Sequence, residues 1–152
     1  MLLRRWQMPV LDAIERLVGL QAQTTHSWYH GLWTRLEDFK PERLAEMLVN
    51  RKVARIALMR STIHLVTARD CLWLRRLTQP VIERSTKGSF GRHWIGLDIE
   101  AVVAAGSSLV EEKPRTFSEL GKLPAERWPD RNPAALAQII RALVPLVQAP
   151  PR

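Results

Sequence analysis

The chain has 152 residues, of which 46% are hydrophobic and 25% are charged, and this length suits one ordinary domain or two small ones. The composition excludes wholesale disorder, and no run approaches the roughly 20 consecutive apolar residues that cross a bilayer. The N-terminus lacks the apolar segment of a secretory signal. A single cysteine, Cys71, excludes a disulfide framework and a thiolate-rich zinc site, and it suits the reducing cytoplasm.

The charge of the chain is strongly basic. Lys and Arg number 23 against 15 Asp and Glu, which gives a formal net charge of +8. Residues 1–80 contribute +6 of this, with 13 basic and 7 acidic side chains. Four basic residues of this half crowd one short region: Arg51, Lys52, Arg55 and Arg60. Clustered arginine in a basic domain favours a polyanionic partner such as nucleic acid, although a solvated basic face gives the same composition.

Hydrophobic spacing predicts the elements of the first half in order. Apolar residues at helical spacing predict helices over 9–18, 26–35 and 41–50, with Gly19 ending the first of them. Residues 53–66 change to the two-residue period of strands, which predicts a two-stranded ribbon. A helix start signal at Thr67 follows the ribbon. Helices followed by such a ribbon have the order of a winged helix.

The second half repeats this order after a segment, 85–96, whose glycines and serines predict a linker. A helix is expected over 99–110, and a capping box formed by Thr116 and Glu119 predicts a short second one. Asn132, followed by a proline, predicts the start of a third.

Residues 144–149 are expected to form the first strand of a second wing. The predicted fold is therefore mainly α with small β wings (α+β), built from tandem winged-helix or helix-turn-helix units. The first unit is expected over 1–84, and the second, over 97–152, is incomplete at its wing.

The third helix of the second half carries small and polar side chains off its apolar stripe: Asn132, Ala135, Gln138 and Arg141. On a recognition helix, Gln138 and Arg141 would make bidentate contacts to base edges. An ordinary solvated face explains the same pattern.

The spacing of the histidines and the single cysteine does not predict a metal site. His26 and His30 are four residues apart, as metal ligands are, but zinc needs at least three protein ligands and no third one stands nearby. We expect both histidines in a partly buried aromatic cluster and Cys71 in the core. No motif indicates a cofactor.

The segment from Arg60 to Val66 interleaves a basic residue, two hydroxyls and a histidine with strand-forming apolar residues. On an extended strand, Thr62 and His64 share one face. Both are candidates for DNA contacts, although a lone histidine on a strand is more often structural.

Gln21-Ala22-Gln23 is the most informative short segment. On a helix its two amides would diverge by about 200°, but on an extended segment both project to one side. Gly19, just upstream, favours the non-helical geometry. Two amides on one side would orient a water molecule or a sugar, whereas a polar helix terminus explains the residues without any function.

Three segments together carry a resemblance. Residues 18–23, 59–66 and 145–152 occur in this order and at similar spacing in the AlkZ-like winged-helix DNA glycosylases, and the similarity covers nearly the whole chain. The resemblance implies tandem winged-helix domains that line a basic DNA channel, and removal of alkylated bases, in some members from interstrand crosslinks. It also implies a catalytic Gln-x-Gln motif (Gln-x-Asp in a sister group), which here is Gln21 and Gln23.

Two departures from the family pattern stand out. Ser61 occupies a position where family members usually have glycine, which affects the turn before Thr62. The family continues past the segment that ends here at Arg152, into the rest of the second wing and a third winged helix. The chain is therefore expected to be an N-terminal fragment.

The chemistry of base excision agrees with the roles that the resemblance implies for Gln21 and Gln23. Cleavage of the glycosidic bond of an N7- or N3-alkylated purine neutralises the cationic base as it leaves, so no strong general acid is needed. Neutral amides can hold the attacking water and stabilise the positive charge that develops on the sugar.

We expect a monofunctional DNA glycosylase, active with the missing C-terminal part, in which Gln21 and Gln23 are catalytic. Its partner is double-stranded DNA with alkylated bases, and it is expected to be a monomer in the cytoplasm, associated with the nucleoid, without membrane or metal. Two alternatives stay open: a non-enzymatic winged-helix regulator and an inactive truncated remnant. The expected DNA contacts are Arg51, Lys52, Arg55, Arg60, Thr62, His64, Gln138 and Arg141.

Overall fold

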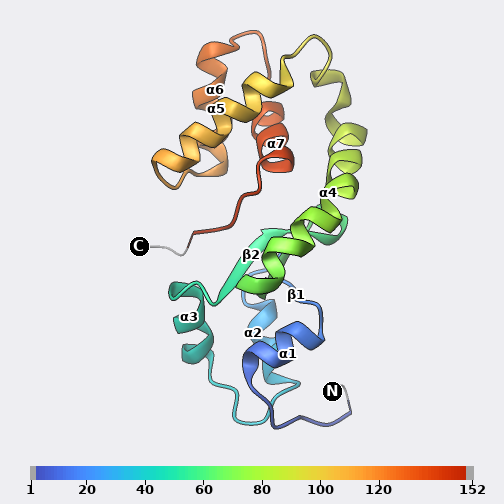
Figure 1. Ribbon diagram of the computed structural model, residues 1–152, viewed down its shortest axis with the longest axis vertical. Coiled ribbons are helices and arrows are strands. Elements are labelled where there is room, and N and C mark those ends of the chain that lie inside the picture. Colours follow the sequence, from blue (N-terminus) through green and yellow to red (C-terminus); the bar gives the residue numbers. More distant parts are fainter. Residues whose placement is uncertain (1–2, 150–152) are drawn as a thin grey trace. The chain divides into compact units, whose positions relative to one another are not determined.

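Residues 3–149, the part of the chain that the structure describes, form seven α-helices and one small antiparallel sheet, which confirms the predicted α+β class. The structure is a computed structural model and describes residues 3–149. These residues form two units (Figure 1). The first contains the described parts of Met1–Thr78 and Val147–Arg152, and the second is Gln79–Leu146.

The first unit follows the predicted order of helices and then a two-stranded ribbon. A short strand also joins the sheet, whose strand order is β1-β3-β2. The elements in chain order are α1 (Val10–Arg16), β1 (Leu20–Gln21), α2 (Ser27–Trp33), α3 (Pro41–Val49), β2 (Val53–Ala57), the 3-10 turn η1 (Met59–Ser61), β3 (Ile63–Thr67) and α4 (Ala68–Phe90), which continues into the second unit.

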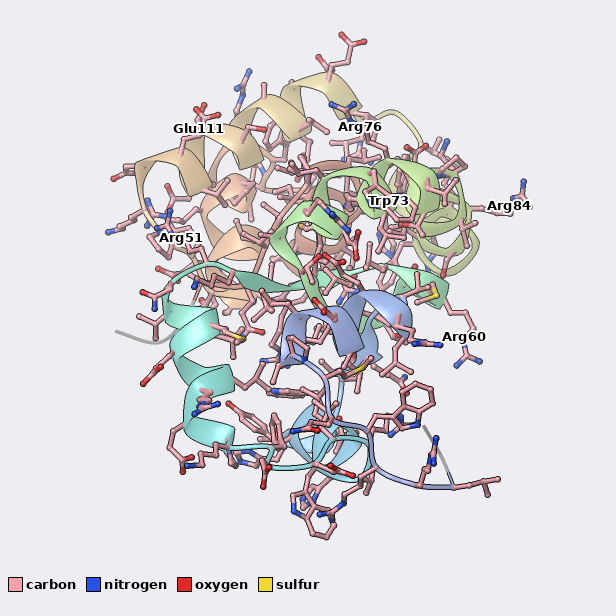
Figure 2. All side chains as sticks on the ribbon, turned by 60° about the horizontal axis from the view of Figure 1, so that its bottom comes forward. Arg51, Arg60, Trp73, Arg76, Arg84 and Glu111 are labelled. Atoms are coloured by element: carbon pink, nitrogen blue, oxygen red, sulfur yellow. The ribbon has the colours of Figure 1, made fainter. Side chains whose placement is uncertain are left out.

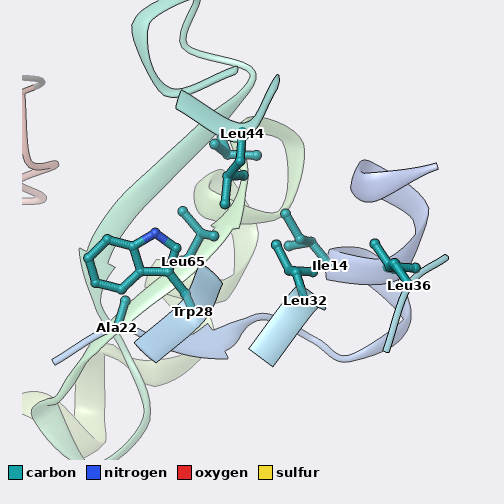
Figure 3. Packing of buried hydrophobic residues seen from close by; sticks show 9 residues of the cluster. Ile14, Ala22, Trp28, Leu32, Leu36, Leu44 and Leu65 are labelled. Carbon is teal, nitrogen blue, oxygen red and sulfur yellow. The ribbon is translucent and has the colours of Figure 1, made fainter. Parts of the chain in front are cut away.

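The two faces of the sheet pack against different helices, because successive strand side chains point to opposite faces. Leu65 of β3 packs on one face with buried residues of the first three helices (Figure 3). Val66, the next residue, packs on the other face against Cys71 and Leu74 at the start of α4. The helix start predicted at Thr67 is present, since its Oγ1 accepts a hydrogen bond from the Asp70 N–H at 3.2 Å. The buried residues of the first face include Ile14, Ala22, Trp28, Leu32, Leu36 and Leu44.

A Schellman turn ends α1 and directs the chain into β1. The Gly19 N–H donates to the Ile14 carbonyl, and the Val18 N–H donates to the Glu15 carbonyl. The left-handed position of the motif, which glycine usually occupies, is taken by Val18 with a φ of 55°. Gly19 follows with a φ of 92°, and a Cβ there would lie 2.9 Å from the Leu65 carbonyl oxygen. The predicted helix end is thus correct, but Gly19 is needed for its close approach to β3.

The second unit is a group of helices around one core. Asn132 caps α7 as predicted, because its Oδ1 accepts from the backbone N–H groups of Ala134 and Ala135. The predicted capping box is present at the start of α6. Val102, Leu136, Ile139 and Ile140 form the centre of the core. The elements are the end of α4, η2 (Gly91–His93), α5 (Ile99–Glu112), α6 (Phe117–Arg127) and α7 (Pro133–Leu143).

Two segments differ from the predicted secondary structure. The predicted linker 85–96 is helical at its start, because α4 continues to Phe90. The strand that was expected over 144–149, as the start of a second wing, is not formed by the described residues 144–149. Instead, Val147 forms an isolated antiparallel bridge with Ile56 at the free edge of β2 in the first unit. An edge strand offers unpaired backbone groups, and this segment satisfies some of them.

Val18→Gly should stabilise the protein. A β-branched residue is strained at a φ of 55°, and the relief should exceed the entropic cost of glycine by about 1 kcal/mol, which raises Tm by about 2–4 °C. Val49→Gly, at the exposed end of α3, should lower Tm because its φ is helical. Thermal unfolding of both variants gives the comparison, and a lower Tm for Val18→Gly would show that this turn is not strained.

Ile140→Ala should destabilise the second unit. Ile140 is fully buried and packs closely against Gly106, where a Cβ would come within 2.6 Å of Cγ2 of Ile140. The cavity left by the truncation should cost about 2–5 kcal/mol in the free energy of unfolding. Ile95→Ala is the matched control, because Ile95 is 76% exposed. Urea unfolding that shows equal midpoints for both variants would contradict this assignment of the core.

Candidate functional site

Gln21 is the last residue of β1, and Gln23 lies two positions further on, in a bend. Both are exposed, and Ala22 between them is fully buried in the core below the sheet. This alternation is the one predicted for extended backbone. Among the described residues, no hydrogen bond of the Gln21 side-chain amide is found, and the side chain is exposed.

The hydrogen-bond ladder between β1 and β3 ends at Ala22, where a side chain replaces one of the two expected backbone acceptors. The Ala22 N–H donates to the Ile63 carbonyl at 2.7 Å. The Ile63 N–H, however, donates to Oε1 of the Gln23 side chain at 3.0 Å. Since a backbone N–H is only a donor, this bond also establishes which atom of the Gln23 amide is the oxygen. The Gln23 side chain is therefore held by β3.

Arg55 of β2 holds the carbonyl of Ala22. Its Nη2 donates to the Ala22 oxygen at 2.7 Å, and its guanidinium carbon lies 4.3 Å from the centroid of the Trp28 ring. The Nε atom is also removed from solvent and makes no hydrogen bond among the described residues. Burial lowers the pKa of Arg55 from its usual value. The guanidinium thus faces the interior of the first unit.

His64 of β3 lies directly opposite Gln21 in the register of the sheet. It is 7% exposed, and its Nδ1 is 3.0 Å from the Thr62 carbonyl oxygen. A carbonyl only accepts, so Nδ1 carries the proton and, in the neutral ring, Nε2 is an acceptor. The Thr62 hydroxyl donates to the Met59 carbonyl at 3.0 Å, which closes the hairpin. Facing cross-strand residues are in contact distance, so His64 borders the Gln21 position.

The four basic residues that crowd one region of the sequence do not form one surface. Arg51 and Lys52 are exposed at the turn between α3 and β2. Arg60 is exposed at the tip of the hairpin, at the other end of β2. Figure 2 shows Arg51 and Arg60 on opposite sides of the first unit. With Arg55 directed inward, the region provides two separate exposed basic positions.

The candidate residues of α7 differ in exposure. Gln138 and Arg141 are half-buried, and burial lowers the pKa of Arg141. Ala135, which the sequence placed on the polar face, is 2% exposed, so that assignment is wrong. The reason is that α7 packs against both α5 and α6, which leaves a narrow outer face (Figure 1).

The ring of His26 lies 6.4 Å from that of Trp28 and 6.0 Å from that of Tyr29, as expected for an aromatic cluster. Both His26 and His30 are exposed, however, so the expected partial burial of the two histidines is wrong. Cys71 is buried, and burial raises the pKa of its thiol, as expected for a core residue. Among residues 3–149, no group of three or more His, Cys, Asp and Glu is arranged to hold a metal ion. No helix in the described part of the chain is both long and apolar enough to span a membrane.

Sequence reasoning missed the residues that support the Gln-x-Gln segment. Arg55 contacts Ala22 across 33 positions of the chain, and the Ser27 hydroxyl approaches the Gln21 carbonyl at 3.2 Å. The sequence shows Arg55 as one of several basic residues, with no signal that distinguishes it from its neighbours.

Comparison with known proteins identifies one family. The model of a family described as DNA glycosylase AlkZ-like matches residues 14–152, which include every candidate residue described above. The chain matches no curated protein and no solved structure.

Lys52→Ala and Arg60→Ala should each weaken the salt dependence of DNA binding. Each side chain is exposed and able to neutralise one phosphate, so the slope of log K against log salt should fall in magnitude by about 0.9 per residue removed. Lys113→Ala is the control, because Lys113 follows Glu111 and Glu112 directly. Fluorescence anisotropy with a DNA duplex at several salt concentrations gives the slopes. Equal slopes for the wild type and both variants would show that these residues do not contact phosphates.

Proposed function

Because the chain belongs to the AlkZ-like DNA glycosylase family, we propose that it hydrolyses the N-glycosidic bond of N7- or N3-alkylated purines in double-stranded DNA. The observation that carries this proposal is that Gln21 and Gln23 are both exposed, while Ala22 between them is buried and its carbonyl is held by Arg55. The element order of the first unit, three helices and then a hairpin, supports a winged-helix interface to DNA.

The chemistry of the substrate explains why two neutral amides suffice. An N7- or N3-alkylated purine carries a positive charge that disappears when the glycosidic bond breaks, so the leaving base does not need a proton. The sugar becomes positively charged in the transition state, and a water molecule must reach it. Amide oxygens stabilise this charge and orient the water, and they do so best when they are held in place before the reaction.

The side chain of Gln23 is held by a hydrogen bond to β3 and that of Gln21 is not, so we propose different roles for the two residues. Gln23 already accepts the Ile63 N–H through one lone pair of Oε1, so its second lone pair and its NH₂ group are held in a defined direction. Gln21 is exposed and lies opposite His64 in the register of the sheet. We assign to Gln23 the fixed contact to the sugar or water, and to Gln21 the adjustable one.

The DNA contacts that accompany this chemistry are proposed for the exposed residues around the hairpin. Arg60 at its tip and Arg51 and Lys52 at its base would neutralise phosphates on either side of the site. Thr62 follows the hairpin tip directly, and His64, a further candidate opposite Gln21 in the sheet, is only 7% exposed. Gln138 and Arg141 belong to the second unit and remain candidates for contacts farther along the DNA.

Gln21→Ala and Gln23→Ala should each lower the rate of base excision by about 100-fold or more, with DNA affinity nearly unchanged. Each variant removes a preorganised polar group that acts mainly in the transition state. Gln23→Glu should retain more activity than Gln23→Ala, because a carboxylate oxygen also accepts the Ile63 N–H. The measurement is release of N7-methylguanine from a duplex, read as alkali-labile abasic sites under single-turnover conditions.

Gln7→Ala is the control for this series, because Gln7 is exposed and precedes the family match. If the double variant Gln21→Ala/Gln23→Ala still excises the base at the wild-type rate, neither glutamine is catalytic. Tight binding of the duplex by the wild type, without release of the base, would contradict the proposed reaction and favour a non-enzymatic DNA-binding protein.

A further inference from the structure

We infer that Arg55 is a positioning residue for Gln23: it holds the Ala22 carbonyl outside the β1–β3 ladder, and so leaves the Ile63 N–H to bind the Gln23 amide. The hydrogen-bond pattern carries this inference. Its consequence for catalysis rests on the proposed function.

The register of the sheet shows that a backbone bond has been replaced. Leu20 lies opposite Leu65 and Gln21 opposite His64, so Ala22 comes opposite Ile63. In a regular antiparallel ladder, residues of a hydrogen-bonded pair exchange both of their bonds. The Ala22 N–H does bond the Ile63 carbonyl at 2.7 Å, but the return bond from the Ile63 N–H goes to Oε1 of Gln23 at 3.0 Å. The Gln23 side chain has taken the place of the Ala22 carbonyl.

This exchange leaves the Ala22 carbonyl without its partner in the ladder, and Arg55 donates a hydrogen bond to it instead. A fully buried alanine cannot offer its carbonyl to solvent freely, and a carbonyl without a partner costs free energy. Nη2 of Arg55 satisfies it at 2.7 Å with a charge-assisted bond. Without this bond, the Ala22 carbonyl has one nearby alternative, which is the Ile63 N–H now held by Gln23. The two bonds, Arg55 to Ala22 and Ile63 to Gln23, therefore depend on each other.

Arg55 is itself held on three sides. Its backbone lies opposite Leu65 in the β2–β3 pair, and its carbonyl accepts the Gln148 N–H at 2.9 Å. Its guanidinium stacks on Trp28, whose ring is 6% exposed and lies beside Ala22 (Figure 3). A side chain fixed in this way has little freedom to leave the Ala22 carbonyl.

An arginine suits this position better than a lysine does. The planar guanidinium can stack on the Trp28 ring and donate a hydrogen bond in its own plane at the same time. A lysine ammonium keeps the charge but loses the planar stack. A phosphate contact, in contrast, accepts either residue as a positive charge. Arg55→Lys therefore separates a positioning role from a DNA contact.

The first test follows the Gln23 side chain by NMR on the free full chain. Its carboxamide signals are identified as those that disappear in Gln23→Glu. Arg55→Lys and Arg55→Ala should both shift these signals toward the values of solvent-exposed glutamine, whereas Lys52→Ala, an exposed neighbour, should leave them in place. Unchanged Gln23 signals in folded Arg55→Lys and Arg55→Ala would overturn the inference. If Arg55→Ala does not fold, the Arg55→Lys spectrum decides.

The second test measures excision and the salt dependence of DNA binding in the same variants. Arg55→Lys and Arg55→Ala should lower the single-turnover rate about 10- to 100-fold, the scale of a misplaced catalytic group, with an unchanged salt slope. A fall of the slope by about 0.9 in Arg55→Ala, with full activity in Arg55→Lys, would identify Arg55 as a phosphate contact instead. A wild-type chain that excises no base contradicts the proposed function, and the NMR test still decides the role of Arg55.

Discussion

The hydrogen bond from Arg55 to the Ala22 carbonyl is the interaction on which the arrangement of the candidate site depends. It joins β2 to the end of β1 under β3, so that all three strands of the sheet contribute to one short segment. It also explains why Gln23 points toward β3, since the Ile63 N–H needs an acceptor once the Ala22 carbonyl is engaged elsewhere. The half-buried guanidinium of Arg55 thus contacts the protein's own backbone and the Trp28 ring.

This arrangement divides the basic residues of the first unit by task. Residues at the two ends of β2 are exposed and carry charge toward solvent, whereas the arginine in the middle of the strand supports the backbone. The fold accounts for the division, because Arg51, Lys52 and Arg60 lie in the turns that flank β2, whereas Arg55 lies within the strand, on the face that it shares with Leu65. A net charge of +8 therefore overstates the number of side chains that are directed toward a DNA backbone.

Much of the fold could be predicted from the sequence where the signals are local. The capping box at Thr116 and Glu119, the Asn132 cap and the alternation of the hairpin all depend on residues within a few positions of one another. The same holds for the non-helical geometry of Gln21-Ala22-Gln23, which follows from an early helix end. Predictions failed where a segment has two acceptable local conformations. Residues 85–90 contain residues typical of a linker and are nevertheless the end of α4.

The sequence by itself predicted most of the elements, the family resemblance and the candidate pair Gln21 and Gln23, because caps, periodicity and motifs are read over short distances. It did not predict β1 or the last turns of α4. Only the tertiary structure decided which side chains act together. Arg55 meets Ala22 across 33 positions, and Val147 returns to the edge of β2 from the far end of the chain. Such contacts follow from strand register and from the packing of helices on each face, and a single sequence records neither. The direction of one guanidinium, toward the interior or toward DNA, is therefore a property of the folded chain.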